Sequence, residues 1–111
     1  MQMDNNQYHQ LVDHVMLQIQ NYLDFYINSH EIDCEIKYNM LIIEFKNKNQ
    51  IIINKQEFLQ EIWMATKDTG YHFQYKNQNW ICKRTDINFW TIISQCCFLE
   101  CNVPFYFNQK K

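Results

Sequence analysis

The chain has 111 residues and a mass of 13.8 kDa, which fits one domain spanning residues 1–111. Hydrophobic residues make up 47% of it and aromatic residues 16%, which excludes an intrinsically disordered chain. No apolar run approaches the roughly 20 residues of a membrane span, and the first residues lack the basic segment of a secretory signal, so we expect a cytoplasmic protein with no membrane partner.

The net charge of −2 is unevenly distributed along the chain. All 10 basic residues lie in residues 37–111, whereas six of the 12 acidic residues lie in residues 1–36. The first third can therefore attract cations or a basic partner, although short chains also vary in charge by chance. Phosphate binding needs clustered Lys and Arg, so we do not expect this end to bind nucleic acid.

Residues 7–26 have the periodicity of an amphipathic helix. Apolar side chains recur at the spacing of one helical face: Tyr8, Leu11, Val12, Val15, Met16, Ile19, Tyr22, Leu23 and Tyr26. Asp13 and Asp24 occupy the opposite side, and residues 4–6 offer an N-cap. Such a helix is expected to cover another layer of the protein.

From residue 32 the period changes to two, because residues 32, 34 and 36 are apolar and alternate with Asp33, Glu35 and Lys37. Further short strands are predicted at 41–45, 51–54, 71–75 and 80–82, whereas residues 58–66 fit either a strand or a helical face. The chain contains a single Gly, so the turns are expected to rely on Asn, which tolerates left-handed backbone: Asn39, Asn47, Asn49 and Asn77.

Asp86 is expected to cap a second helix. This helix has a buried stripe formed by Phe89, Trp90, Ile93, Cys96 and Cys97. It ends at residues 102–104 and leaves an apolar tail at 103–107. Strands joined by short turns must be antiparallel. We therefore predict an α+β fold, a two-layer α-β sandwich in which helices at the two ends of the chain cover one face of a five- or six-stranded antiparallel sheet.

Thiol chemistry has little support in the sequence. Cys34 and His72 could pair as nucleophile and base, but the alternation places Cys34 on the buried side of its strand. Cys97 and Cys101 lie one helical turn apart with Cys96 beside them and could bind a soft metal, although core filling is the simpler interpretation. No acid, base and nucleophile converge, so we do not expect an enzyme.

The carboxylates of one predicted strand are better candidates. Asp33 and Glu35 point to the same side of that strand, and Glu31 lies beside them. Hard cations prefer oxygen ligands, so this surface could bind divalent or trivalent cations weakly, through charge density. The alternative is a solvated acidic face without a ligand.

Trp63 is the other residue that the pattern singles out. If residues 58–66 form a strand, Trp63 lies with Glu61 and Ala65 on its polar side. An exposed Trp on an open sheet usually marks a contact site. If these residues form a helix, Trp63 belongs to the core.

Six short motifs, spaced along the chain, decide between these two forms of residues 58–66. They are IDCEI at 32–36, IIINKQE at 51–57, IWMATK at 62–67, GYHF at 70–73, WIC at 80–82 and FW at 89–90. In this order and spacing they resemble the bacterial frataxin family (CyaY-type proteins), from about Tyr8 to Cys97. The resemblance implies that residues 58–66 are a strand, which places Trp63 on the open face.

The resemblance also implies a function. Frataxins bind iron and regulate iron–sulfur cluster assembly by docking on the cysteine desulfurase and its scaffold protein. Carried over to this chain, the iron ligands are His9, Asp13, Asp24, Glu31, Asp33 and Glu35, and the partner-binding residues are Asn54, Gln56 and Trp63. We expect a monomer that holds iron weakly.

One departure from the family pattern keeps an alternative open. The end of the first helix, usually a dense acidic run in the family, carries here Gln20, Asn21, Phe25, Ile27 and Ser29. The alternative is therefore an interaction module of the same machinery with little or no iron binding.

Overall fold

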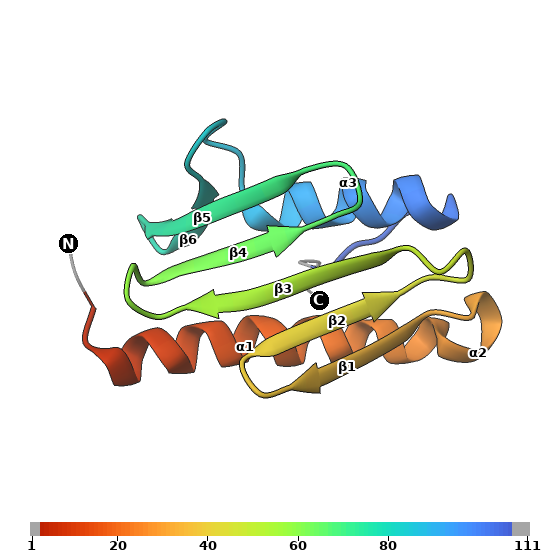
Figure 1. Cartoon of the computed structure of the whole chain (residues 1–111), viewed down its shortest axis with the longest axis horizontal. Coiled ribbons are helices and arrows are strands. Elements are labelled where there is room, and N and C mark those ends of the chain that lie inside the picture. Colours follow the sequence, from red (N-terminus) through yellow and green to blue (C-terminus); the bar gives the residue numbers. More distant parts are fainter. Residues whose placement is uncertain (1–2, 108–111) are drawn as a thin grey trace.

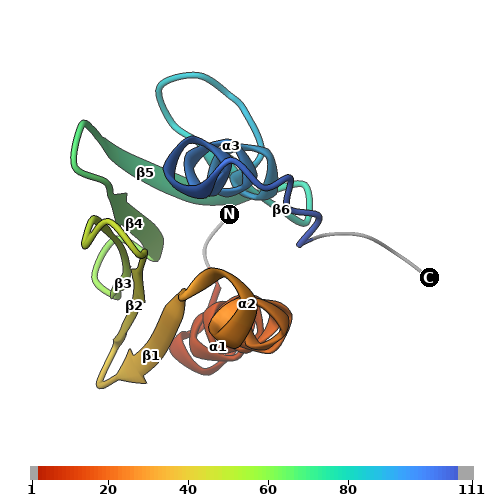
Figure 2. The same cartoon turned by 90° about the vertical axis from the view of Figure 1, so that its right-hand side faces the viewer.

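The computed structural model describes residues 3–107. Its elements are helix α1 (Asn5–Leu23), the 3-10 turn η1 (Asp24–Tyr26), helix α2 (Ile27–His30), strands β1 (Asp33–Lys37), β2 (Met40–Glu44), β3 (Gln50–Gln56), β4 (Glu61–Ala65), β5 (Gly70–Lys76) and β6 (Asn79–Cys82), and helix α3 (Phe89–Cys101). The six strands form one open antiparallel sheet in chain order. The helices lie on one of its faces, α1 toward β1 and α3 toward β6 (Figures 1 and 2). The predicted two-layer sandwich is confirmed.

Helix α1 begins at a capping box. The Asp4 carboxylate accepts a hydrogen bond from the Gln7 backbone N–H at 2.8 Å, and the Gln7 side chain accepts one from the Asp4 backbone N–H at 3.3 Å. These bonds satisfy backbone donors that have no partner inside the helix. The helix then buries one stripe against the sheet: Tyr8, Val12, Val15, Met16, Ile19 and Leu23.

The expectation that Asp86 caps the second helix is wrong. The N-cap of α3 is Asn88, whose side-chain oxygen accepts a hydrogen bond from the Trp90 backbone N–H at 2.8 Å. An isolated bridge between Asn88 and Ile81 holds the chain against β6, so the helix starts only after Asn88. Asp86 lies two residues earlier, exposed and with a left-handed backbone.

The turns use Asn less than expected. Of the four predicted turn residues, Asn77 alone has a positive φ. At the other predicted turns the left-handed conformation is adopted by a neighbouring residue with a larger side chain, such as Tyr38 or Lys48. Asn47 contributes through its side chain, which accepts a hydrogen bond from the Asn49 backbone N–H at 2.9 Å.

Residues 58–66, which the sequence predicted as either a strand or a helical face, do not form a helix. Residues 61–65 are a strand, which confirms the strand that the family resemblance implied. The strand is shorter than the predicted range of 58–66, because residues 57–60 form the turn that precedes it. Phe58 and Leu59 therefore do not join a buried helical face, and Phe58 is 91% exposed.

The apolar tail at residues 103–107 packs between the two long helices. The Phe107 ring lies 4.7 Å from the Tyr22 ring of α1 and 6.1 Å from the Trp90 ring of α3. The Tyr22 hydroxyl accepts a hydrogen bond from the Tyr106 backbone N–H at 2.8 Å. The tail thus closes the groove between α1 and α3, and its aromatic rings at Phe105 and Phe107 are buried. Among residues 3–107, no helix has both the length and the apolar character needed to cross a membrane.

One buried hydrogen bond fixes α1 to the middle of the sheet. The hydroxyl of Tyr8, which is fully buried, donates to the Glu61 carbonyl oxygen on β4 at 2.7 Å. We expect Tyr8→Phe to lower the free energy of unfolding by about 1–2 kcal/mol, because it leaves that carbonyl without this donor. Urea unfolding measures the change. Tyr38→Phe, at a side chain that is 93% exposed, is the matched control, and an equal effect of the two variants would contradict the assignment.

Candidate functional site

The open face of the sheet brings together the three residues predicted to bind a partner, Asn54, Gln56 and Trp63, which we call the sheet-face patch. In the antiparallel register Asn54 lies opposite Trp63, and Gln56 lies opposite Glu61. On the other side of β4, Trp63 lies opposite His72 of β5. The patch therefore spans adjacent strands on the face that the helices leave open (Figure 2).

Trp63 is held in place rather than free. Its ring stacks on the exposed His72 ring with centroids 4.1 Å apart and an angle of 7° between the planes. Its indole N–H donates a hydrogen bond to Glu61 Oε1 at 2.8 Å. The sequence predicted an exposed Trp, whereas the structure shows a half-buried one that stacks on one neighbour and is hydrogen-bonded to another.

Glu61 is a buried carboxylate on this otherwise open face, with 4% of its surface exposed. Its Oε2 lies 2.8 Å from the Nζ of Lys83, the residue that follows β6. Burial alone raises the pKa of this carboxyl, but the hydrogen bonds from Lys83 and Trp63 outweigh burial and hold the pKa below its ordinary value. Glu61 is therefore ionised and fully paired at neutral pH.

The Asn54 side chain contains an unused acceptor. Its Oδ1 is buried and has no hydrogen-bond partner among the described residues. The residue lines a shallow hollow of about 400 Å³, formed by Met40, Ile52, Asn54, Trp63, Met64, Ala65, Gly70, Tyr71 and His72. Burying an acceptor without a donor is unfavourable. A molecule seated in the hollow would cover the indole of Trp63, which also lines it.

Three residues of this face were not recognised from the sequence. His72 was considered only as a base for Cys34, and neither Glu61 nor Lys83 was assigned a role. The signal for His72 and Glu61 was present, because strict alternation along β4 and β5 places both on the side of Trp63. Lys83 follows β6, and its contact with Glu61 crosses β5, so no local pattern indicates it.

The predicted iron ligands of α1 are already occupied by a basic residue. Lys55 of β3 has a side chain only 7% exposed, and its Nζ lies 2.7 Å from Asp13 Oδ1 and 2.9 Å from His9 Nδ1. His9 Nε2 lies 3.4 Å from Glu57 Oε2. The first third of the chain has no Lys or Arg of its own, but the fold supplies one from a strand more than forty residues away.

The remaining predicted ligands are exposed and lie along β1 or just before it. Asp33 and Glu35 occupy the open face of β1. In the register of the two strands, Asp33 lies opposite another carboxylate, that of Glu44 on β2. Asp24 lies in η1. Glu31 is the residue that follows α2, and its backbone has the left-handed conformation. Within residues 3–107, no three His, Cys, Asp or Glu side chains come close enough together to hold a metal ion. A cation here would be attracted by the density of surface charge.

The thiol pairing considered from the sequence is wrong. Cys34 is on β1 and His72 is on β5, so three strands separate them. Burial raises the pKa of the half-buried Cys34 thiol to about 12, and it raises that of the Cys97 thiol as well. Both are neutral at physiological pH and are poor nucleophiles. The Cys101 thiol lies 3.2 Å from the backbone oxygen of Cys97, as expected of thiols that fill space along a helix.

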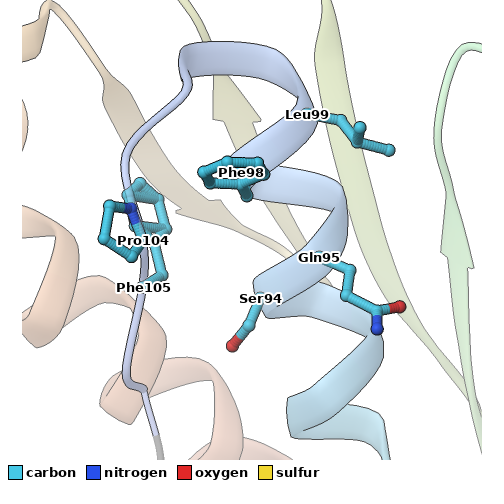
Figure 3. A pocket seen from close by; sticks show the side chains of 6 residues that line it. All are labelled: Ser94, Gln95, Phe98, Leu99, Pro104 and Phe105. Atoms are coloured by element: carbon cyan, nitrogen blue, oxygen red, sulfur yellow. The ribbon is translucent and has the colours of Figure 1, made fainter.

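A second hollow, of about 420 Å³, lies on the far side of the molecule between α3 and the tail (Figure 3). It is lined by Ser94, Gln95, Phe98, Leu99, Pro104 and Phe105. None of these side chains titrates, and the two polar ones are neutral, so the hollow contains no acid, base or metal ligand. This hollow therefore offers no side chain for acid–base or metal chemistry, in contrast to the open sheet face.

Comparison with known proteins agrees with the architecture. The family model described as a frataxin-like domain matches residues 1–102. The iron–sulfur cluster assembly protein CyaY from Buchnera aphidicola subsp. Baizongia pistaciae is 48% identical over 97 residues, which are 87% of this chain and 82% of that protein. Its counterpart from Buchnera aphidicola subsp. Acyrthosiphon pisum is 46% identical over 107 residues, 96% of this chain and 92% of that protein.

Solved structures agree as well. The frataxin of Psychromonas ingrahamii, 28% identical, superposes with a TM-score of 0.88 over 96% of this chain and 100% of that chain. A trimeric frataxin of the yeast Saccharomyces cerevisiae, complexed with ferrous iron and 19% identical, gives a TM-score of 0.69 over 93% of this chain and 90% of that chain. The second similarity shows the fold alone.

The lowered pKa of Glu61 makes part of the stability depend on pH. We expect Glu61→Gln to lower the free energy of unfolding at neutral pH by about 1–2 kcal/mol, because the amide cannot replace the charged partner of Lys83. The carboxylate contributes fully above its unfolded-state pKa of about 4.3, and this contribution is lost as the pH falls through the lower folded-state pKa.

The difference between wild type and Glu61→Gln should therefore close in acid. Urea unfolding at a series of pH values measures it, with Asp68→Asn, at an exposed loop residue, as the control. A difference that stays constant down to about pH 3 would show that ionisation of Glu61 does not stabilise the fold.

Proposed function

Because the chain belongs to the frataxin-like family, we propose that it is an accessory protein of iron–sulfur cluster assembly, with no catalytic turnover of its own. It docks on the cysteine desulfurase and its scaffold protein through the open sheet face, and it binds iron weakly through surface carboxylates. We further propose that it works in the cytoplasm as a monomer, without a nucleic-acid or membrane partner. The names of its relatives support the assembly role.

The observation that carries the docking proposal is the arrangement of the sheet-face patch. It combines a half-buried indole stacked on His72 with the unused acceptor of Asn54 at a hollow of about 400 Å³. Protein interfaces favour an aromatic anchor surrounded by a few well-placed polar groups. A partner segment that presents apolar surface would fill the hollow and cover the indole.

The iron proposal rests on the exposed carboxylates at and before β1. Asp33, Glu35 and Glu31 are all exposed, and Glu44 lies across from Asp33. Asp13 and His9 are weaker candidates, because Lys55 already occupies one of their ligand atoms each. The yeast frataxin of the same fold is described as complexed with ferrous iron, which supports the choice of metal.

The second candidate function is an interaction module of the same machinery with little or no iron binding. The Lys55 contacts favour this second candidate, because the Lys55 ammonium group neutralises the charge of Asp13, one of the predicted iron ligands on α1. The thinned acidic run of the first helix favours it too. Iron titration separates the two candidates, whereas docking is common to both.

We expect Asp33→Asn with Glu35→Gln to weaken iron binding while the fold stays intact, because exposed carboxylates carry the charge but little of the packing. Calorimetric titration with ferrous iron measures the affinity. The matched control is Asp68→Asn with Asp86→Asn, which removes the same charge from exposed loop residues. Equal affinities of the two double variants would remove β1 from the iron site.

We expect Trp63→Ala to weaken binding to a bacterial desulfurase–scaffold complex by about 2 kcal/mol or more, as truncation of an interface anchor does. Its cost in stability should stay below the roughly 3–5 kcal/mol of a core Trp, because one side of the indole faces the hollow. A binding titration and thermal melts on the same variant test both statements. Phe58→Ala, at an aromatic residue that is 91% exposed on the β3–β4 turn, is the control. If the two variants bind alike, docking does not use this face.

A further inference from the structure

We propose that Glu61 is a positioning residue of the docking face, whose carboxylate holds the Trp63 indole in the orientation that a partner binds. The inference rests on the proposed function of that face and adds to it the group on which the anchor depends. The contacts of Glu61 carry the proposal.

Both carboxylate oxygens of Glu61 have a partner. Oε1 accepts the hydrogen bond from the Trp63 indole N–H, and Oε2 accepts one from Lys83 Nζ, each at 2.8 Å. The backbone of the same residue is fixed from the opposite face of the sheet, because its carbonyl oxygen accepts the hydrogen bond from the Tyr8 hydroxyl at 2.7 Å. Glu61 therefore connects the anchor to the helix layer on one side and to the end of β6 on the other.

This arrangement removes two costs from binding. A buried indole N–H without an acceptor is unfavourable, and Glu61 satisfies that N–H before any partner arrives. An interface side chain also loses rotational freedom on binding, and Trp63 has already lost it between Glu61 and the His72 ring. A partner then needs only to cover the remaining face of the indole.

Lys83 has a supporting part. Its side chain is 49% exposed, so its ammonium group stays hydrated while it pairs with Glu61. Without a positive neighbour, a carboxylate this deeply buried would favour its neutral form and become a weaker acceptor for the indole. The orientation of Trp63 therefore depends on a residue that does not itself belong to the sheet-face patch.

Four variants separate positioning from general stability. Glu61→Met removes both acceptors at similar volume, and Glu61→Gln keeps an oxygen that can accept from the indole N–H. Gln74→Met is the matched control, because Gln74 pairs directly with Glu61 across the strands and lies on the same face. Trp63→Ala reports whether the face docks at all. Each is titrated against a purified bacterial desulfurase–scaffold complex, and the indole N–H resonance of Trp63 is followed by NMR.

We expect Glu61→Met to weaken binding about three- to tenfold, the cost of ordering one large side chain on association. Glu61→Gln should remain within about twofold of the wild type, since the hydrogen bond to the indole is kept. Gln74→Met should bind as the wild type does. The Trp63 indole resonance should move and broaden in Glu61→Met, and it should keep near its wild-type position in Gln74→Met.

The outcomes distinguish this inference from the proposal beneath it. Normal binding by Trp63→Ala overturns docking through this face and the role of Glu61 together. Weakened binding by Trp63→Ala with normal binding by Glu61→Met overturns the positioning role alone. If Glu61→Met fails to fold, Lys83→Met replaces it, and an unchanged Trp63 resonance with unchanged binding in that variant also overturns the positioning role.

Discussion

The apolar side of the sheet is covered by two helices and by the tail that closes the groove between them. The burial of this side determines which residues lie on the open face. Side chains alternate along each strand, so every inward apolar residue fixes an outward neighbour. In β4, burial of Ile62 and Met64 forces Glu61 and Trp63 to the open face. These outward residues have no second layer above them and must find partners among themselves.

The open face meets this requirement with one connected group of side chains. One ion pair, one hydrogen bond and one ring stack connect four side chains, which come from β4, β5 and the residue after β6: Lys83, Glu61, Trp63 and His72. The acidic surface is organised differently. There Lys55 leaves the inward side of β3 and reaches α1, so the junction between layers is itself charged. The carboxylates near β1 are exposed instead, and Glu35 lies only 3.9 Å from the Nζ of Lys37 on the same strand.

The features that the sequence predicted are those set by repeating patterns. The period of 3.6 residues located α1, the period of two located the outward carboxylates of β1, and the apolar tail was evident from residues 103–107. Residues 58–66 were ambiguous, because a five-residue strand is too short for either period to prevail, and the family resemblance decided the matter.

The features that the sequence did not predict depend on contacts between distant segments. Lys55 reaches His9 across 46 positions and Lys83 reaches Glu61 across 22, and no local spacing encodes either contact. The start of α3 was misplaced because Asp86 and Asn88 are both good caps, and a bridge to β6 chooses between them. The burial of Glu61 could not be predicted for the same reason. An acidic residue near a Trp on the polar side of a strand is expected to be solvent-exposed unless its partners are known.

The tail between α1 and α3 has a consequence for how the chain folds during synthesis. Its contacts with α1 join residues 84 and 89 positions apart, so they can form only after the sheet and α3 have been synthesised. Until that segment emerges, the aromatic rings of Tyr22 in α1 and Tyr26 in η1 lack the cover that Phe105 and Phe107 provide. A chain that has not yet acquired the tail therefore exposes these aromatic rings, and transiently exposed apolar surface of this kind favours aggregation.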